Sequence, residues 1–138
     1  MVALVAEPID VDVLERAVRS PECGGAVTFL GIVRNRANDG RAVDALEYEA
    51  HREMTLAEFK AIVDEVHAAW PGTRLGVMHR VGSLVVGDIA VAVCAAAPHR
   101  VDAFRACEYA IDEVKKRAPI WKRERYLDGG AEWVENAC

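Results

Sequence analysis

Residues 89–126 of the chain read IAVAVCAAAPHRVDAFRACEYAIDEVKKRAPIWKRERY. The first part, Ile89 to Ala97, is an apolar run that predicts a buried strand. From Arg100 to Arg117 the apolar residues recur at helical spacing, which predicts a long helix that ends before Pro119. Ile120 to Tyr126 then alternates from face to face as a strand does. This segment therefore predicts a strand, a helix and a second strand in succession.

The same kinds of pattern continue on the N-terminal and C-terminal sides of this segment. They predict a helix at Val11–Arg19, capped by Asp10, and a second long helix at Thr55–Trp70. Further strands are predicted at Ala26–Val33, Val43–Ala50, Arg74–Val81 and Ala131–Val134. Long helices interleaved with strands indicate an α+β fold, with two long helices on one face of a mostly antiparallel sheet. We expect residues 1–138 to form a single domain, because no linker divides them.

The composition argues against several classes of protein. No apolar run approaches the roughly 20 residues that span a bilayer, and the N-terminus lacks the basic segment of a secretory signal. A net charge of -5 disfavours a general nucleic-acid-binding protein. The four cysteines form no CxxC pair, and Cys94 and Cys107 lie in apolar segments. We therefore expect reduced thiols in a cytoplasmic protein.

Positive charge is concentrated at the end of the C-terminal helix and just after it. Lys115 to Arg125 hold six of the chain's 17 lysines and arginines, which in an acidic protein indicates an anion site. Lys115 projects at nearly the same angle as Phe104 and Ile111, toward the protein, whereas Lys116 and Arg117 are rotated away. Partial burial suits a lysine to acid–base or nucleophilic chemistry. The alternative is a lysine at a helix end whose ammonium group simply reaches solvent.

Strand alternation separates the charges that follow. Lys122 shares a face with Ile120 and can point back toward Lys115, so that two lysines converge on a phosphate or carboxylate. Arg123 and Arg125 lie on the other face with Trp121, and we expect them, like Lys116 and Arg117, to meet solvent or a partner. The alternative for the whole strand is a charged edge that resists aggregation.

Three more residues are candidates for anion binding. His99 and Arg100 open the C-terminal helix, where backbone N–H groups and the helix dipole attract anions. Arg34 follows a strand and precedes a polar loop, as a substrate clamp would. A capping histidine and solvent-facing arginines are the alternative. About 15 residues of helix, roughly 22 Å, separate Arg100 from Lys115, too far for one small substrate. We therefore expect a homodimer in which two copies share the site.

Metal, thiol and nucleotide motifs are missing from the sequence. The four histidines, His51, His67, His79 and His99, lack the spacing of metal ligands. No cysteine has the electropositive neighbours of a catalytic thiol, and no glycine-rich phosphate motif is present. We expect no metal site.

Several blocks of sequence occur together and in order. They are residues 25–35 (GAVTFLGIVRN), 46–49 (LEYE), 62–65 (IVDE), 79–82 (HRVG), Gly87-Asp88, His99-Arg100 and 115–124 (KKRAPIWKRE). In these blocks the chain resembles the large, catalytic subunit of molybdopterin synthase, the MoaE family, and the similarity spans nearly the whole chain.

The resemblance implies an α/β hammerhead-type domain with an added small β-subdomain. It also implies a sulfurtransferase of molybdenum cofactor biosynthesis that works as a heterotetramer, a central homodimer with a small ubiquitin-like subunit at each end. The C-terminal Gly-Gly of that partner carries a thiocarboxylate, from which two sulfurs pass to cyclic pyranopterin monophosphate to form the dithiolene of molybdopterin. The resemblance implies no metal or organic cofactor for this chemistry.

The same resemblance implies roles for seven residues. Lys115 and Lys122 are the catalytic residues, Lys115 as general acid/base or as the site of a transient link to the small subunit, and Lys122 to polarise the substrate or thiocarboxylate. Arg34, His99 and Arg100 bind the pterin phosphate, the last two from the second copy, and Phe29 and Ile111 line the pocket. No role follows for Cys138.

Two other functions remain open on the residues alone. The same cations would suit a non-catalytic phosphate- or nucleotide-binding α+β module. The basic segment would also suit a docking surface for an acidic partner.

Overall fold

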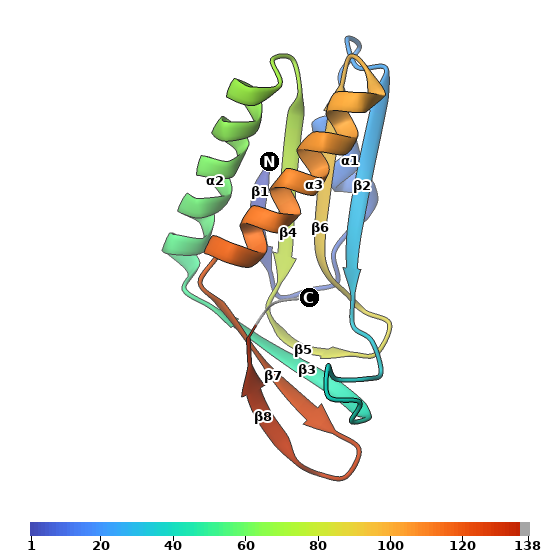
Figure 1. The fold of residues 1–138 in the computed structure, drawn as a ribbon, viewed down its shortest axis with the longest axis vertical. Helices are drawn as coiled ribbons and strands as arrows, with labels where there is room; N and C mark the ends of the chain where they lie inside the picture. The colour runs from blue at the N-terminus through green and yellow to red at the C-terminus, as the bar shows by residue number, and fades with distance from the viewer. Residues whose placement is uncertain (136–138) are drawn as a thin grey trace.

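The computed structural model describes residues 1–135, which form eight strands and three helices (Figure 1). In chain order these are β1 (Val2–Val5), α1 (Val11–Val18), β2 (Gly25–Ile32), β3 (Val43–Ala50), α2 (Arg52–Ala69), β4 (Arg74–Arg80), β5 (Gly82–Val85), β6 (Ile89–Ala97), α3 (Arg100–Arg117), β7 (Ile120–Tyr126) and β8 (Ala131–Val134). The sequence patterns predict all of them except β1 and β5, two strands of four residues each.

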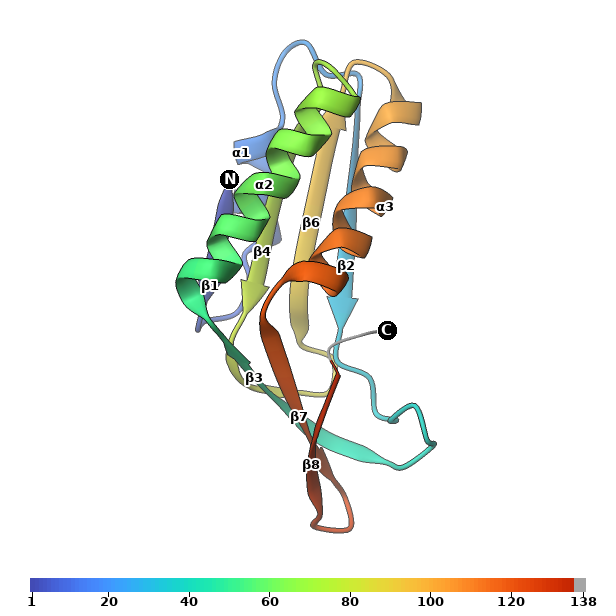
Figure 2. The same cartoon turned by 60° about the vertical axis from the view of Figure 1, so that its left-hand side comes forward.

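The strands form two sheets of four. The first has the order β1-β4-β6-β2, with β1 parallel to β4 and the other pairs antiparallel. The second has the order β5-β3-β7-β8 and is antiparallel throughout. It extends from the end of the first sheet as a small β-subdomain (Figure 2). The predicted α+β class is confirmed.

The helices cover both faces of the first sheet. The long helices α2 and α3 lie together on one face, as predicted, while α1 lies behind the sheet (Figure 1). Strand β6 is buried on both sides for this reason. Its Val91 and Val93 belong to the main core with α2 and α3, whereas Ala92 and Cys94 pack with α1. Burial on both faces explains why this strand is a continuous apolar run.

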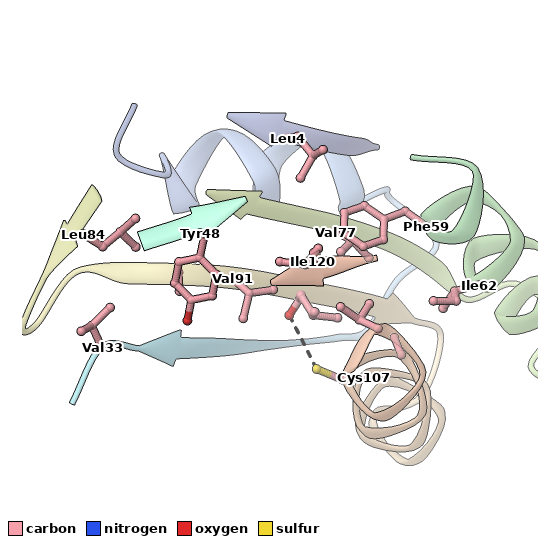
Figure 3. Close-up of a cluster of buried hydrophobic side chains, with 14 of the residues drawn as sticks. Leu4, Val33, Tyr48, Phe59, Ile62, Val77, Leu84, Val91, Cys107 and Ile120 are labelled. Carbon is pink, nitrogen blue, oxygen red and sulfur yellow. Dashed lines mark hydrogen bonds between the residues drawn. The ribbon is translucent and has the colours of Figure 1, made fainter. Parts of the chain in front are cut away.

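The main core joins the two sheets. Phe59 and Ile62 of α2 pack with Val77 of β4, while Tyr48 and Ile120 bring β3 and β7 of the second sheet into the same cluster (Figure 3). The second sheet is therefore anchored to the core at the end nearest α3.

Helix α3 presents small side chains to the sheet. Its buried residues are Ala103, Ala106, Cys107, Ala110 and Val114. Phe104, which helical spacing predicts to be in the buried stripe, is 60% exposed. The prediction is wrong because the buried stripe follows the alanines, and their size lets the helix lie close to β6 and β2.

Within residues 1–135, no helix combines the length and apolar character needed to cross a membrane. The thiols of Cys23, Cys94 and Cys107 are free. Cys138 lies outside the described residues.

Candidate functional site

A cavity of about 300 Å³ lies where the two sheets meet the C-terminal end of α3. The first sheet contributes Gly31, Ile32, Ala90 and Val91, and the second contributes Leu46, Tyr48, Lys122 and Glu124. Lys115 enters from α3, and Arg34, Arg36 and Asn38 come from the loop between β2 and β3. Residues far apart in the sequence thus meet at the joint between the two layers.

The corner between α3 and β7 sets the positions of the two lysines. The helix ends at Ala118, whose N–H donates to the carbonyl of Val114 at 3.1 Å. The carbonyl of Pro119 then accepts from the N–H of His51 at 3.1 Å and from Oγ1 of Thr55 at 3.4 Å. The start of α2 therefore fixes the turn that aims α3 and β7 at one cavity.

Lys115 and Lys116 differ in burial as the helix angle predicts. Lys115 is half-buried and lines the cavity, whereas the side chain of Lys116 is 72% exposed and pairs with Glu113 at 3.5 Å. Only the first of these adjacent lysines can act on a ligand in the cavity.

Lys122 and Glu124 reach the cavity through the register of the second sheet. Lys122 lies opposite Tyr48, and Glu124 lies opposite Leu46, so all four side chains share one face. Glu124 is 9% exposed and accepts a hydrogen bond from the hydroxyl of Tyr126 at 3.0 Å. Burial, together with this bond, raises the pKa of Tyr126 to about 12. Its hydroxyl therefore stays a donor to the carboxylate at neutral pH.

The loop between β2 and β3 is shaped by hydrogen bonds of its own. Arg34 donates to the side chain of Asn38, and Arg36 donates to the carbonyl of Gly40 at 3.2 Å. The N–H of Val43 donates to the carbonyl of Asn35 at 2.9 Å. These bonds hold Arg34 over the cavity next to the lysines.

The balance of charge in the cavity favours an anion. Its lining includes the cations Lys115, Lys122, Arg34 and Arg36, against the carboxylate of Glu124. Cations that converge in a partly enclosed site attract phosphates and carboxylates. The described residues include no cluster of three or more His, Cys, Asp or Glu that would hold a metal ion.

His99 and Arg100 lie apart from this cavity. They stand at the first turn of α3, both exposed, at the opposite end of the helix from Lys115. The separation predicted from helix length is thus present, and one chain does not bring these residues to the lysines. The side chain of His99 forms no capping hydrogen bond, so the capping alternative does not explain it.

Phe29 and Ile111 flank the cavity without being among its lining residues. Phe29 is 37% exposed on β2, and a Cβ placed on the cavity residue Gly31 would lie 3.6 Å from its ring. Ile111 lies one turn before Lys115 and packs against the main core.

Arg117 departs from the sequence prediction. Instead of meeting solvent or a partner, it donates to Glu58, Glu65 and Glu113 at 2.9, 2.6 and 3.3 Å. The bonds to Glu58 and Glu65 tie the end of α3 to α2, and all three bonds raise the pKa of the guanidinium group above its ordinary value. Arg123 and Arg125 pair with Glu47 of the neighbouring strand.

Five residues at or behind the cavity escape the sequence reasoning: Arg36, Asn38, Tyr48, Glu124 and His79. Arg36 and Asn38 follow Arg34 in the same loop, and Glu124 shares the face of Lys122, so spacing alone would have found these three. Tyr48 and His79 belong to strands, and only the packing of the two sheets brings them here.

Comparison with known proteins agrees with this arrangement. A family described as "MoaE protein" matches residues 4–117. A protein of Nostoc sp. named molybdopterin synthase catalytic subunit is 41% identical, over 99% of this chain and 83% of its own length. A protein of Pyrococcus abyssi with the same name is 43% identical, over 97% of this chain and 90% of its own length.

Solved structures show the same fold. A crystal structure of molybdopterin synthase from Staphylococcus aureus superposes with a TM-score of 0.90 at 40% identity, covering 95% of this chain and 94% of that one. A complex of subunits 1 and 2 of molybdopterin-converting factor from Helicobacter pylori has a chain with a TM-score of 0.77 at 20% identity, covering 97% of this chain and 88% of that one. The family match and the identities above 40% together place this chain in the MoaE protein family.

Proposed function

We propose that the chain is the catalytic subunit of a molybdopterin synthase, a sulfurtransferase of molybdenum cofactor biosynthesis. The sulfur donor is the thiocarboxylated C-terminal Gly-Gly of a small ubiquitin-like subunit, and the acceptor is cyclic pyranopterin monophosphate. Family membership and the names of the similar proteins support this reaction. The two-subunit complex from Helicobacter pylori supports the small partner.

The convergence of Lys115, Lys122 and Arg34 on one cavity is the observation that carries the proposal. A thiocarboxylate and a phosphorylated pterin are both anions, and a site with several cations and one carboxylate suits them. Lys115 acts as general acid/base, or links transiently to the small subunit. Lys122 polarises the substrate or the thiocarboxylate, and Arg34 binds the pterin phosphate, with Phe29 and Ile111 beside them.

The proposed working unit is a homodimer within a heterotetramer, in which His99 and Arg100 of one copy complete the cavity of the other. Two features support it. Strand β2 is an edge of the first sheet, and an open edge can pair with a second chain. Beside that edge, Ile32 is 58%, Val101 54% and Phe104 60% exposed, and a group of exposed apolar side chains suits a surface that a partner covers.

We assign the enzyme to the cytoplasm, and the three free thiols support a reducing compartment. Residues 1–138 are proposed to act as one domain.

Reconstitution tests the reaction. The chain is mixed with a thiocarboxylated small subunit and cyclic pyranopterin monophosphate, and molybdopterin is detected by mass spectrometry or as a fluorescent oxidised derivative. We expect product that depends on the thiocarboxylate, with none from the carboxylate form of the same partner. A chain that binds both components and yields no product would be the phosphate-binding module instead.

A further inference from the structure

His79 lies directly behind the wall of the cavity. It is fully buried at the end of β4, and its ring meets the ring of Tyr48 edge-on, with 5.0 Å between centroids. Tyr48 lines the cavity, and so does Lys115, whose positive charge acts on His79. His79 therefore contacts Tyr48, a residue of the cavity wall, without lining the cavity itself.

The surroundings of His79 fix its tautomer. Nδ1 lies 2.8 Å from the carbonyl oxygen of Arg80, and a carbonyl only accepts, so Nδ1 carries the hydrogen. Burial lowers the pKa of His79 to about 4, and the charge of Lys115 acts in the same direction. The ring is therefore neutral at physiological pH, and Nε2 presents a lone pair.

The Nε2 atom of His79 is in an unusual position for a polar atom, because it is buried and has no hydrogen-bond partner among residues 1–135. Leaving a buried acceptor without a partner is unfavourable, so such atoms are usually matched in the working protein. The charged and titratable side chains that line the cavity are Lys115 from α3, Tyr48 from β3, Lys122 and Glu124 from β7, and Arg34 and Arg36 from the loop. Arg80, next to His79 in the chain, is paired with Asp88 at 3.3 Å. Of these, Lys115 is the cation whose charge reaches the ring.

We propose that His79 is a positioning residue for Lys115: its Nε2 accepts a hydrogen bond from the ammonium group of Lys115, which fixes the amine at the cavity wall and holds its proton until transfer. The importance of this contact for turnover rests on the proposed function. A neutral imidazole suits the task because it orients the ammonium group without adding a second positive charge. A protonated ring would repel Lys115 and have no lone pair to offer.

The first test observes the contact itself, in the folded protein. Two-bond ¹H–¹⁵N spectra report the protonation of each imidazole nitrogen, and they are recorded for the wild type and Lys115→Met, free and with inorganic phosphate as probe anion. We expect Nδ1 protonated and Nε2 bare, with the Nε2 resonance moving in Lys115→Met in at least one condition. An Nε2 resonance identical in both proteins in both conditions would overturn the proposal, as would hydrogen on Nε2.

The second test measures Lys115 by its rate of acetylation against pH, read by mass spectrometry. The variant His79→Gln keeps an acceptor near the position of Nε2, whereas His79→Leu removes it. Because an acceptor favours the ammonium form, the labelling midpoint of Lys115 should fall by about one pH unit in His79→Leu and less in His79→Gln. Lys60, exposed on α2, is the internal reference, and His67→Leu is the control for loss of an exposed histidine.

A structural role alone would leave that midpoint in place, and an unchanged midpoint in a folded His79→Leu would refute the idea. If His79→Leu does not fold, the comparison of the imidazole spectra of the wild type and Lys115→Met tests the contact on its own. In the sulfur-transfer assay, His79→Leu should lower kcat with little change in KM. Neither the spectra nor the labelling requires turnover, so the contact and the reaction are tested separately. If reconstitution yields no molybdopterin but the labelling midpoint of Lys115 shifts in His79→Leu, the proposed reaction is rejected and the contact between His79 and Lys115 stands.

Discussion

Lys115 lies three residues before the helix cap at Ala118, and Lys122 lies four residues after it. One turn of backbone therefore places both side chains. The carbonyl of Pro119 in this turn accepts hydrogen bonds from His51, the N-cap of α2, and from Thr55 in its first turn. The concentration of positive charge in the sequence indicates this segment as an anion site. Within it, helix angle selects Lys115 and strand alternation selects Lys122, the two lysines that line the cavity. The sequence could not reveal His79, because its role depends on a ring contact between strands of different sheets.

His79 also makes the stability of the protein depend on pH. Its pKa is about 4 in the folded protein against an ordinary value of 6.5. The unfolded chain therefore binds a proton between these values that the folded protein does not, and stability falls as the pH drops through this window. The loss is on the order of 3 kcal/mol at most.

Urea unfolding at a series of pH values measures this effect. His79→Gln should be less stable at neutral pH and should show a flatter loss of stability from pH 6.5 to about 4 than the wild type does. Equal slopes for the two proteins would mean that His79 is not the group responsible.

At the scale of elements, α1 and β4 pack closely because Gly76 has no side chain. A Cβ there would lie 2.6 Å from Cδ1 of Leu14 and 2.7 Å from Cγ2 of Val18, both well inside ordinary contact. Helix α1 carries the second core on the back of the sheet, where these two residues pack with Met78 and Cys94. The packing of α1 on β4 therefore leaves no room for a side chain at Gly76.

Gly76→Val should displace α1 and lower the free energy of unfolding by about 1–3 kcal/mol, the usual cost of overpacking. Thermal and urea unfolding measure the change. Val13→Ala, on the exposed side of the same helix, is the matched control and should stay within about 0.5 kcal/mol of the wild type. A Gly76→Val protein as stable as this control would show that α1 can move away at no cost.

Periodicity predicted the elements well where they were long and one-sided, such as α2 and β3, and where burial on both faces made β6 a continuous apolar run. It could not predict β1, because four residues that pair in parallel with β4 carry no turn or hairpin signal. It also misplaced Phe104, since apolar spacing does not distinguish a residue that faces the core from an exposed apolar residue.

At the scale of the whole molecule, the length of α3 separates two groups of candidate residues. Lys115 lies in the cavity at one end, and His99 and Arg100 are exposed at the other. The open edge of β2 and the exposed apolar side chains beside it offer a surface on which a second copy would bring the groups together.

Mixed dimers test this sharing. Lys115→Ala and Arg100→Ala, each inactive alone, are co-expressed and purified together. If Arg100 serves the cavity of the other copy, half of the dimers are mixed and each has one intact site, which restores about one quarter of the wild-type activity. Two variants that form dimers and restore nothing would place Arg100 outside the shared site.

The central claim is that the cavity performs sulfur transfer through Lys115 and does more than hold anions. Single-turnover formation of molybdopterin from the thiocarboxylated small subunit tests it most directly, with binding of cyclic pyranopterin monophosphate measured in parallel. Lys115→Ala should lower the rate by about 10²–10⁴-fold while retaining most of the binding, and its exposed neighbour variant Lys116→Ala should keep nearly the full rate. A Lys115→Ala protein that forms molybdopterin as fast as Lys116→Ala would contradict the account.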